Sequence, residues 1–454
     1  MSTLLTGISE LWTLDPARDD AAGRAGSVGA AVPAGATGAT SSAGATADQV
    51  VHDGALVIED GRIAWTGAAT EAPAADERVD LGGRAVLPGW VDSHTHLVFA
   101  GDRSAEFEAR MAGQAYAAGG IQVTTDATRA ASDAELAELV RGRIGEARRG
   151  GTTTLETKTG YGLTVEDEAR AAALAAELVA AGELDEVTFL GAHLVPPEFR
   201  EGSGAAGADA TTGADAYVDL VVGDMLAAVA RAGGSALRWI DVFCEEGAFE
   251  TARSRRVLEA GRAAGLGLRI HGNQMGTSQQ GVQLACELGA ASVDHLNFLD
   301  TADVEALAGT ASRPVREDGR TPGHLAVDAG PTVATVLPAC DLSTRAPLAP
   351  ARDLLDAGAE LAIASNCNPG TSYTSAMTFC VATAVLQMHL SLAEAIRAAT
   401  RGGALALRRS DVGHLGVGAR ADLHVLDAPA AIHLAYRPGM PLTHSVWRAG
   451  ERIV

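Results

Sequence analysis

Two histidines separated by one residue are the strongest sign of chemistry in this chain. His94 and His96 stand in Leu-Pro-Gly-Trp-Val-Asp-Ser-His-Thr-His-Leu at 87–97. Side chains along a strand alternate with a period of two, so both imidazoles would project from one face and could bind the same metal ion. Many pairs of this kind are only surface residues, but this pair ends an apolar strand that follows directly on Pro-Gly. It therefore predicts a metal site at a strand end.

Three more histidines end predicted strands: His193, His271 and His295. Any one of them alone could be a core histidine with its hydrogen bonds satisfied. With the first pair they make five of the chain's 12 histidines, and packing alone does not account for that concentration. Imidazole binds zinc and iron, and an imidazole outside the coordination sphere can accept and return a proton near neutral pH. The pattern predicts metal-assisted chemistry with proton transfer.

An alternating pattern between residues 88 and 410 predicts the strands and helices that position these histidines. Short apolar runs alternate with stretches rich in Ala, Leu, Glu and Arg that have helical character, such as 166–181 and 251–264. Strand followed by helix, repeated this often, favours a closed TIM-like (β/α)8 barrel, whose active sites lie at the carboxyl ends of the strands. The predicted strands are 153–158, 186–193, 239–244, 266–271, 291–295 and 361–365.

The two ends of the chain predict a second, smaller unit. Residues 54–67 are typical of two strands about the turn Glu59-Asp60-Gly61, since Asp-Gly is a strong hairpin signal, and the tail predicts strands within 421–427 and 441–454. We expect residues 1–87 and 411–454 to form a small β-sandwich domain beside the barrel of residues 88–410. Three polar or Gly-rich stretches, at 18–49, 201–214 and 309–330, are expected to be flexible surface loops and are assigned no function.

Composition excludes several kinds of partner. The formal net charge is −22 and no basic patch stands out, which argues against binding to nucleic acid or to an anionic membrane. No run offers the roughly 18 apolar residues of a membrane span, and the amino terminus lacks the basic start of a signal peptide. The five cysteines are spread singly, without a CxxC pair. We expect a cytoplasmic protein that acts on a small molecule.

Six longer motifs allow a family to be suggested. They are His-Thr-His-Leu-Val-Phe-Ala-Gly-Asp-Arg (94–103), Glu-Thr-Lys-Thr-Gly-Tyr-Gly-Leu (156–163), Phe-Leu-Gly-Ala-His-Leu-Val-Pro-Pro-Glu (189–198), His-Gly-Asn-Gln (271–274), Val-Asp-His (293–295) and Asn-Pro-Gly-Thr (368–371). In these motifs, and over nearly the whole chain outside the three loop stretches, the sequence resembles the imidazolonepropionases of the amidohydrolase superfamily. The HxH pair alone would identify only the superfamily.

The resemblance implies a metal-dependent hydrolase. His94, His96 and His271 match the family's metal-binding histidines, and Asn366 stands at the position of a further metal ligand. One zinc or iron(III) ion per subunit would activate water and polarise the substrate carbonyl. The reaction implied is hydrolysis of the cyclic amide of 4-imidazolone-5-propanoate to N-formimidoyl-L-glutamate, in histidine degradation. A homodimer is also expected by resemblance.

The resemblance also implies roles for individual residues. His295 matches the histidine that orients the water or moves its proton, and Arg103 matches an arginine that binds the substrate carboxylate, a task that suits a guanidinium. Tyr161 lies in a Gly-Tyr-Gly loop, where we expect its ring to be displayed rather than buried. Lys158 is assigned no role, because a lysine here bridges two metals in dinuclear relatives whereas the resemblance points to one. The other residues that match substrate contacts are His193, Gln274, Asn368, Gly370 and Thr371.

Asn366 departs from the family pattern, which has an aspartate at this position. Asparagine keeps the shape and one carbonyl oxygen, but it has no charge and cannot act as a base. Three histidines can hold zinc by themselves, so lowered activity is the milder expectation. Three hypotheses follow: a working imidazolonepropionase in which His295 carries proton transfer, a deaminase-like relative acting on another cyclic amide or amidine, and a catalytically silent homologue.

Overall fold

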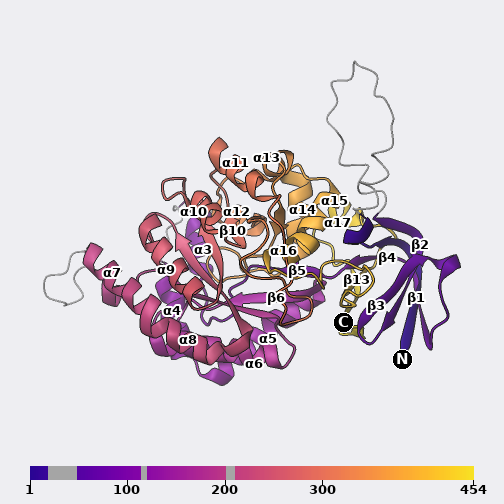
Figure 1. Cartoon of the computed structure of the whole chain (residues 1–454), viewed down its shortest axis with the longest axis horizontal. Coiled ribbons are helices and arrows are strands. Elements are labelled where there is room, and N and C mark those ends of the chain that lie inside the picture. Colours follow the sequence, from indigo (N-terminus) through magenta and orange to yellow (C-terminus); the bar gives the residue numbers. More distant parts are fainter. Residues whose placement is uncertain (19–48, 114–119, 201–209) are drawn as a thin grey trace, which may run out of the picture.

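The chain forms two sheets, and the strands of the larger one build a barrel (Figure 1). A computed structural model describes residues 1–18, 49–113, 120–200 and 210–454. Eight strands are hydrogen-bonded in chain order, and every neighbouring pair is parallel. They are β5 (Trp90–Asp92), β6 (Thr152–Lys158), β7 (Glu186–Ala192), β8 (Leu237–Cys244), β9 (Gly267–Gly272), β10 (Ser292–His295), β11 (Val333–Val336) and β12 (Leu361–Ile363).

The barrel closes just beyond its first and last strands. Thr95 and Cys367 form a parallel bridge, and the His96 N–H donates to the Cys367 carbonyl at 2.9 Å. The Asn366 N–H likewise donates to the His94 carbonyl at 3.0 Å. The closing contacts therefore join the HxH pair to the segment that contains Asn366, and the expected (β/α)8 barrel is confirmed.

Helices on the outside of the barrel connect its strands. Several begin with a side chain that satisfies the free N–H groups of the first turn: Ser132 and Glu135 form a capping box at α5, and Thr164 caps α6. The predicted helices at 166–181 and 251–264 correspond to α6 and α9 to within one residue at each end. The helices after these strands include α5 (Asp133–Arg149), α6 (Val165–Ala180), α8 (Leu226–Gly233), α9 (Thr251–Ala263), α10 (Gly281–Leu288), α11 (Thr301–Thr310), α13 (Ala351–Asp356) and α15 (Leu392–Arg397).

Further helices accompany this series. Two of them bear on the site: α3 follows the HxH segment, and α12 follows β11. These helices are α3 (Ser104–Met111), α4 (Ile121–Ala130), α7 (Ala210–Leu220), α12 (Pro338–Thr344), α14 (Met377–Gln387), α16 (Gly403–Ala406) and α17 (His433–Tyr436).

Both ends of the chain contribute to a separate seven-stranded sheet, as expected (Figure 1). Its strands are β15 (Glu451–Arg452), β14 (Thr443–Arg448), β13 (Leu423–Leu426), β4 (Glu77–Pro88), β1 (Ser2–Trp12), β2 (Val50–Glu59) and β3 (Arg62–Ala68), in that order. The sheet curls around its own apolar core, because Ile63 of β3 exchanges backbone hydrogen bonds of 2.8 and 2.9 Å with Gly418 and Ala419, just before β13. The expected sandwich is thus built from one continuous sheet.

The three expected loops have different outcomes. The first, 18–49, lies outside the described residues except at its two ends, as do positions 201–209 of the second. Residues 210–214 are the start of α7 rather than loop. After α11 ends at Thr310, the stretch 309–330 is mostly exposed and irregular, as expected of a surface loop. It is anchored at one point: Leu325 and Ala326 are buried, and the Leu325 N–H donates to the Arg408 carbonyl at 2.7 Å. Among the described residues, no helix is long and apolar enough to cross a membrane.

Candidate active site

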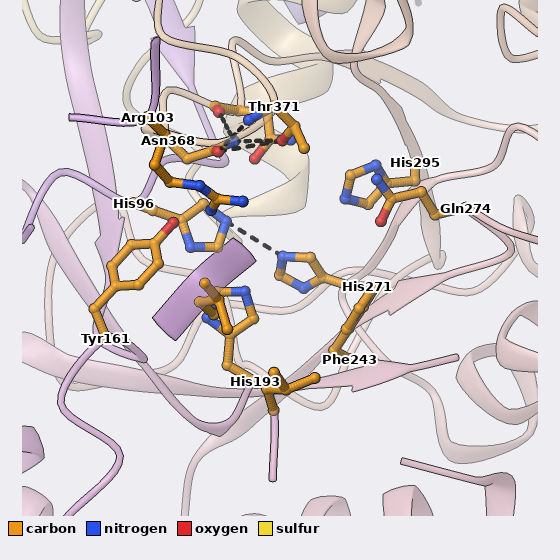
Figure 2. A pocket seen from close by; sticks show the side chains of 13 residues that line it. His96, Arg103, Tyr161, His193, Phe243, His271, Gln274, His295, Asn368 and Thr371 are labelled. Atoms are coloured by element: carbon orange, nitrogen blue, oxygen red, sulfur yellow. Dashed lines mark hydrogen bonds between the residues drawn. The ribbon is translucent and has the colours of Figure 1, made fainter. Parts of the chain in front are cut away.

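A cavity at the carboxyl ends of the barrel strands gathers nearly all of the predicted site residues (Figure 2). His94 stands behind it in the histidine group, and Gly370 lies against Arg103 in its wall. The side chains come from segments far apart in sequence, which meet because parallel strands end at one edge of the barrel. The lining residues are His96, Arg103, Ile121, Tyr161, His193, Leu194, Phe243, His271, Gln274, His295, Asn366, Asn368 and Thr371.

The imidazoles of His94, His96 and His271 meet at one point. Nε2 of His96 lies 3.3 Å from Nε2 of His94 and 3.3 Å from Nε2 of His271. Two nitrogens at about 2.0 to 2.1 Å from a tetrahedral zinc ion lie about 3.3 Å apart, so the spacing fits ligands of one ion. All three side chains are buried. The donor set and its geometry fit a metal ion.

Two buried carboxylates orient this group. Asp294 Oδ2 lies 2.7 Å from Nδ1 of His94, and Asp241 Oδ1 lies 3.0 Å from Nδ1 of His271. A carboxylate can only accept, so each Nδ1 carries the proton and each Nε2 presents its lone pair to the centre of the group. These contacts select the tautomer that a metal ligand needs. Neither aspartate was proposed from the sequence, although Asp294 directly precedes His295 and Asp241 lies on the predicted strand 239–244.

Lys158 holds this layer together. Its Nζ lies 3.0 Å from Glu156 Oε1 and 3.1 Å from Asp241 Oδ2, and all three side chains are fully buried. Burial alone would raise the pKa of the Asp241 carboxyl, but the neighbouring His271 and Lys158 hold it well below its ordinary value. Lys158 was assigned no role from the sequence, but here its side chain pairs with the carboxylate that orients His271. The period of two in β6 could have placed it on the same face as Glu156.

Three buried histidines of the site, His94, His96 and His295, are kept neutral by their surroundings. Burial is the largest cause that lowers the pKa of His94, His96 and His295 well below the ordinary value of histidine, and positive charge on neighbouring groups lowers it further. A neutral imidazole is the form that binds a metal or accepts a proton.

His295 lies within the same group rather than apart from it. One ring nitrogen from each of His94, His271 and His295 can be chosen so that all lie within 4.8 Å of one another. The backbone places it there at a conformational cost, because φ is 89° at His295 and 65° at Leu296, values that side-chain-bearing residues rarely adopt. The geometry therefore allows His295 to act as a ligand or as a proton carrier beside the ion.

Asn366 lines the same cavity as the histidine group. Its side chain is buried, and φ is 52°, in the left-handed region that asparagine and aspartate tolerate better than most residues. Its Oδ1 makes no hydrogen bond of normal geometry with the residues that the structure describes. A buried acceptor without a donor fits a role beside a cation.

Aromatic rings line the opposite side of the cavity. The His193 ring stacks on His96 with centroids 5.4 Å apart, and its Nδ1 lies 2.9 Å from the Gly160 carbonyl. Burial, with the nearby His271, lowers the pKa of His193 to about 3. Tyr161 is only 3% exposed, so the expectation of a displayed ring is wrong. Its ring packs against Phe99 and His193, yet it still faces the cavity.

Polar residues complete the wall. Arg103 is buried, and its Nε and Nη2 donate to both oxygens of Glu106 at 2.8 and 2.7 Å. Gln274 is held by its backbone N–H, which donates to Glu245 Oε1 at 2.5 Å.

The Asn368 side chain is used inside its own loop. Its Oδ1 accepts from the N–H groups of Gly370 and Thr371 at 2.9 and 2.8 Å, and its Nδ2 donates to the Asn366 carbonyl at 2.7 Å. It therefore shapes the loop that lines the cavity.

Comparison with known proteins gives a consistent result. The model of the amidohydrolase family matches residues 107–453. The imidazolonepropionase of Micrococcus luteus is 62% identical and that of an Arthrobacter species 56% identical, each over the full length of both chains.

Solved structures share the fold at low identity. Atrazine chlorohydrolase TrzN from Arthrobacter aurescens, complexed with zinc, covers this chain fully with a TM-score of 0.65 at 17% identity, over 95% of its own chain. A zinc-bound adenosine deaminase from Xanthomonas campestris covers 99% with a TM-score of 0.62 at 16% identity, over 92% of its own chain. The long, close relatives and the histidine group at the barrel mouth lead to one conclusion: the chain belongs to the imidazolonepropionases of the amidohydrolase family.

Proposed function

We propose that this enzyme hydrolyses the cyclic amide of 4-imidazolone-5-propanoate to N-formimidoyl-L-glutamate. The observation that carries the proposal is that a histidine group able to bind a metal and the Arg103 guanidinium lie at the same cavity. A substrate with a ring amide at one end and a carboxylate at the other matches this arrangement. The names of the long relatives support the same substrate.

We propose one zinc or iron(III) ion per subunit, held by His94, His96 and His271, with the Oδ1 of Asn366 facing it. When bound, the ion would act as a Lewis acid toward water and the substrate carbonyl. Two observations support these ligands: the spacing of the three Nε2 atoms, and the contacts of Asp294 and Asp241 with the Nδ1 atoms of His94 and His271. The structure's ligand set suits both metals.

His295 is the proposed proton carrier. Water adds to the ring carbonyl carbon, the bond between that carbon and the ring nitrogen breaks, and the nitrogen leaves with a proton. A neutral His295 can take the proton from water and return it to that nitrogen. Asn366 cannot share this task as an aspartate would, so the full transfer is left to one imidazole and a slower reaction is expected.

The cavity wall would orient the substrate. Arg103 binds the propionate arm, Tyr161 and His193 contact the ring, and Gln274 binds without acid–base work. Asn368 shapes the loop that brings Gly370 and Thr371 to the substrate. All of these except Gly370 line the cavity, and Gly370 packs directly on Arg103.

Two alternatives are not favoured. A deaminase-like enzyme on another cyclic amidine would not explain a buried arginine in the same cavity as the histidines. A silent homologue would not explain why the histidines, their carboxylates and Arg103 stand together. A homodimer, a cytoplasmic location, no nucleic-acid or membrane partner, and a division into residues 1–87 with 411–454 and 88–410 remain predictions.

The test compares the chain with Asn366→Asp for metal content and turnover of imidazolone propanoate. We expect metal and measurable turnover in both, with faster turnover in N366D because a carboxylate joins His295 in proton transfer. Bound metal without turnover in either protein would contradict the proposal. Turnover in N366D alone would assign the defect to Asn366 and support the silent homologue for this chain.

A further inference from the structure

Helix α3 places a second arginine behind the carboxylate-binding one. Arg103 immediately precedes the helix, and Arg110 lies in its last turn with 3% of its surface exposed. Glu106 stands between them: both of its oxygens accept from Arg103, and its Oε1 lies 3.8 Å from Nη1 of Arg110. The two guanidinium groups therefore share one carboxylate.

Arg110 also holds the loop that packs on Arg103. Its Nη2 donates to the Gly370 carbonyl at 2.9 Å. Gly370 lies so close to the Arg103 guanidinium that a Cβ on it would stand 2.3 Å from Nη1 and 2.5 Å from Cζ. A side chain at position 370 would force the Arg103 guanidinium to shift, so the placement of this loop and that of Arg103 depend on each other.

We propose that Arg110 is a positioning residue that sets the affinity and selectivity of the site for one carboxylate. Arg103, Glu106 and Arg110 carry two positive charges and one negative charge, a combination that favours an anionic ligand. The inference rests on the proposed function, which takes Arg103 as the carboxylate-binding group. It adds that Arg110, through Glu106 and Gly370, orients Arg103 and contributes positive charge beside it.

Three physical effects of removing Arg110 have the same sign. The Gly370 carbonyl loses its donor, so the loop can move and Arg103 loses its backing. Glu106 is left to Arg103 alone and neutralises it more completely. One positive charge near the arm is lost. Each effect weakens the binding of a carboxylate, and none acts on a ligand without one.

Calorimetry on the metal-loaded protein tests this without turnover. The probes are 3-(imidazol-4-yl)propanoate, which carries the arm, and 4-methylimidazole, which lacks it. Arg110→Gln should weaken binding of the acid by about tenfold or more, as expected for the loss of charge-assisted hydrogen bonds. Arg110→Lys keeps the charge but lacks the planar guanidinium, and it should weaken binding of the acid severalfold. Binding of 4-methylimidazole should stay unchanged in both variants.

Arg345→Gln is the matched control, because exposed Arg345 also donates to a carbonyl of α3, that of Met111 at 3.2 Å, without a contact to Gly370 among the described residues. It should leave both affinities unchanged. The inference would be overturned if R110Q lost affinity for both probes equally, or if R110K left the ratio of the two affinities unchanged. If R110Q does not fold, R110K provides the test. No preference of the parent protein for the acid would overturn it as well. The two proposals can also fail separately. If the protein prefers the acid in a way that depends on Arg110 but does not turn over imidazolone propanoate, the proposed function is contradicted and this inference is supported.

Discussion

The two walls of the cavity are built differently. The metal-facing wall consists of histidines at strand ends, fixed by fully buried charges: Asp241, Asp294 and Lys158. The arm-facing wall, which we propose binds the propionate, consists of Arg103 and the loop of residues 368–372, joined through Glu106 and Arg110 of α3. Barrel strands carry the side chains of the first wall and buried ion pairs orient them, whereas a short helix and a loop carry those of the second. Substitutions on the two walls should therefore fail in different ways.

The largest effect is expected from Asp241→Asn on the metal-facing wall. It replaces the charged oxygen that orients His271 with a neutral amide oxygen, and it removes the charge that pairs with Lys158. Metal affinity should fall by about 10- to 100-fold, as when such outer partners are lost elsewhere, with turnover falling in parallel. Metal content after dialysis against a chelator measures this. Asp219→Asn, on an exposed surface pair with Arg256, is the control. Full metal retention in D241N would contradict the contrast between the walls.

A smaller effect with a different signature is expected from Arg103→Lys. Lysine keeps the charge but loses the planar fork that grips a carboxylate. KM for imidazolone propanoate should rise by about tenfold, with kcat and metal content nearly unchanged, since Arg103 does not touch the histidine group in the described structure. A fall in kcat at constant KM would show that the two walls are not separable.

The smallest effect is expected in stability alone, at Asp341 of α12. Burial raises the pKa of this carboxyl to about 7. The folded state thus binds its proton more tightly than the unfolded chain does, so this group's contribution is full below about pH 4 and is lost as pH rises through 7. Asp341→Asn should remove at least about 1 kcal/mol of the stability difference between pH 5 and pH 8, measured by urea unfolding. If the stability difference between pH 5 and pH 8 is the same in D341N, the raised pKa of Asp341 is contradicted.

Sequence reasoning reached the metal-facing wall better than the arm-facing one, for a physical reason. His94, His96, His271 and His295 could be placed because parallel strands end at one edge, so strand position alone brings them together. Asp241 and Lys158 lie on predicted strands as well, but their ion pair depends on which face of each strand looks inward. Strand β11 (Val333–Val336) was not among the predicted strands.

The arm-facing wall depends on contacts that no local pattern encodes. Arg110 and Gly370 are 260 residues apart, and their hydrogen bond exists only because the barrel closes at Thr95 and Cys367. The buried ring of Tyr161 was misjudged for a similar reason: a Gly-Tyr-Gly loop is locally typical of display, but Phe99 and His193 cover it from distant segments.

The most direct test of the two-walled cavity is a crystal structure of the metal-loaded protein with 3-(imidazol-4-yl)propanoate, using anomalous scattering to locate the ion. The account predicts an ion at about 2.0 to 2.1 Å from Nε2 of His94, His96 and His271, with the ligand carboxylate on Arg103. A carboxylate bound at the histidines with Arg103 still held only by Glu106, or an ion elsewhere, would contradict it.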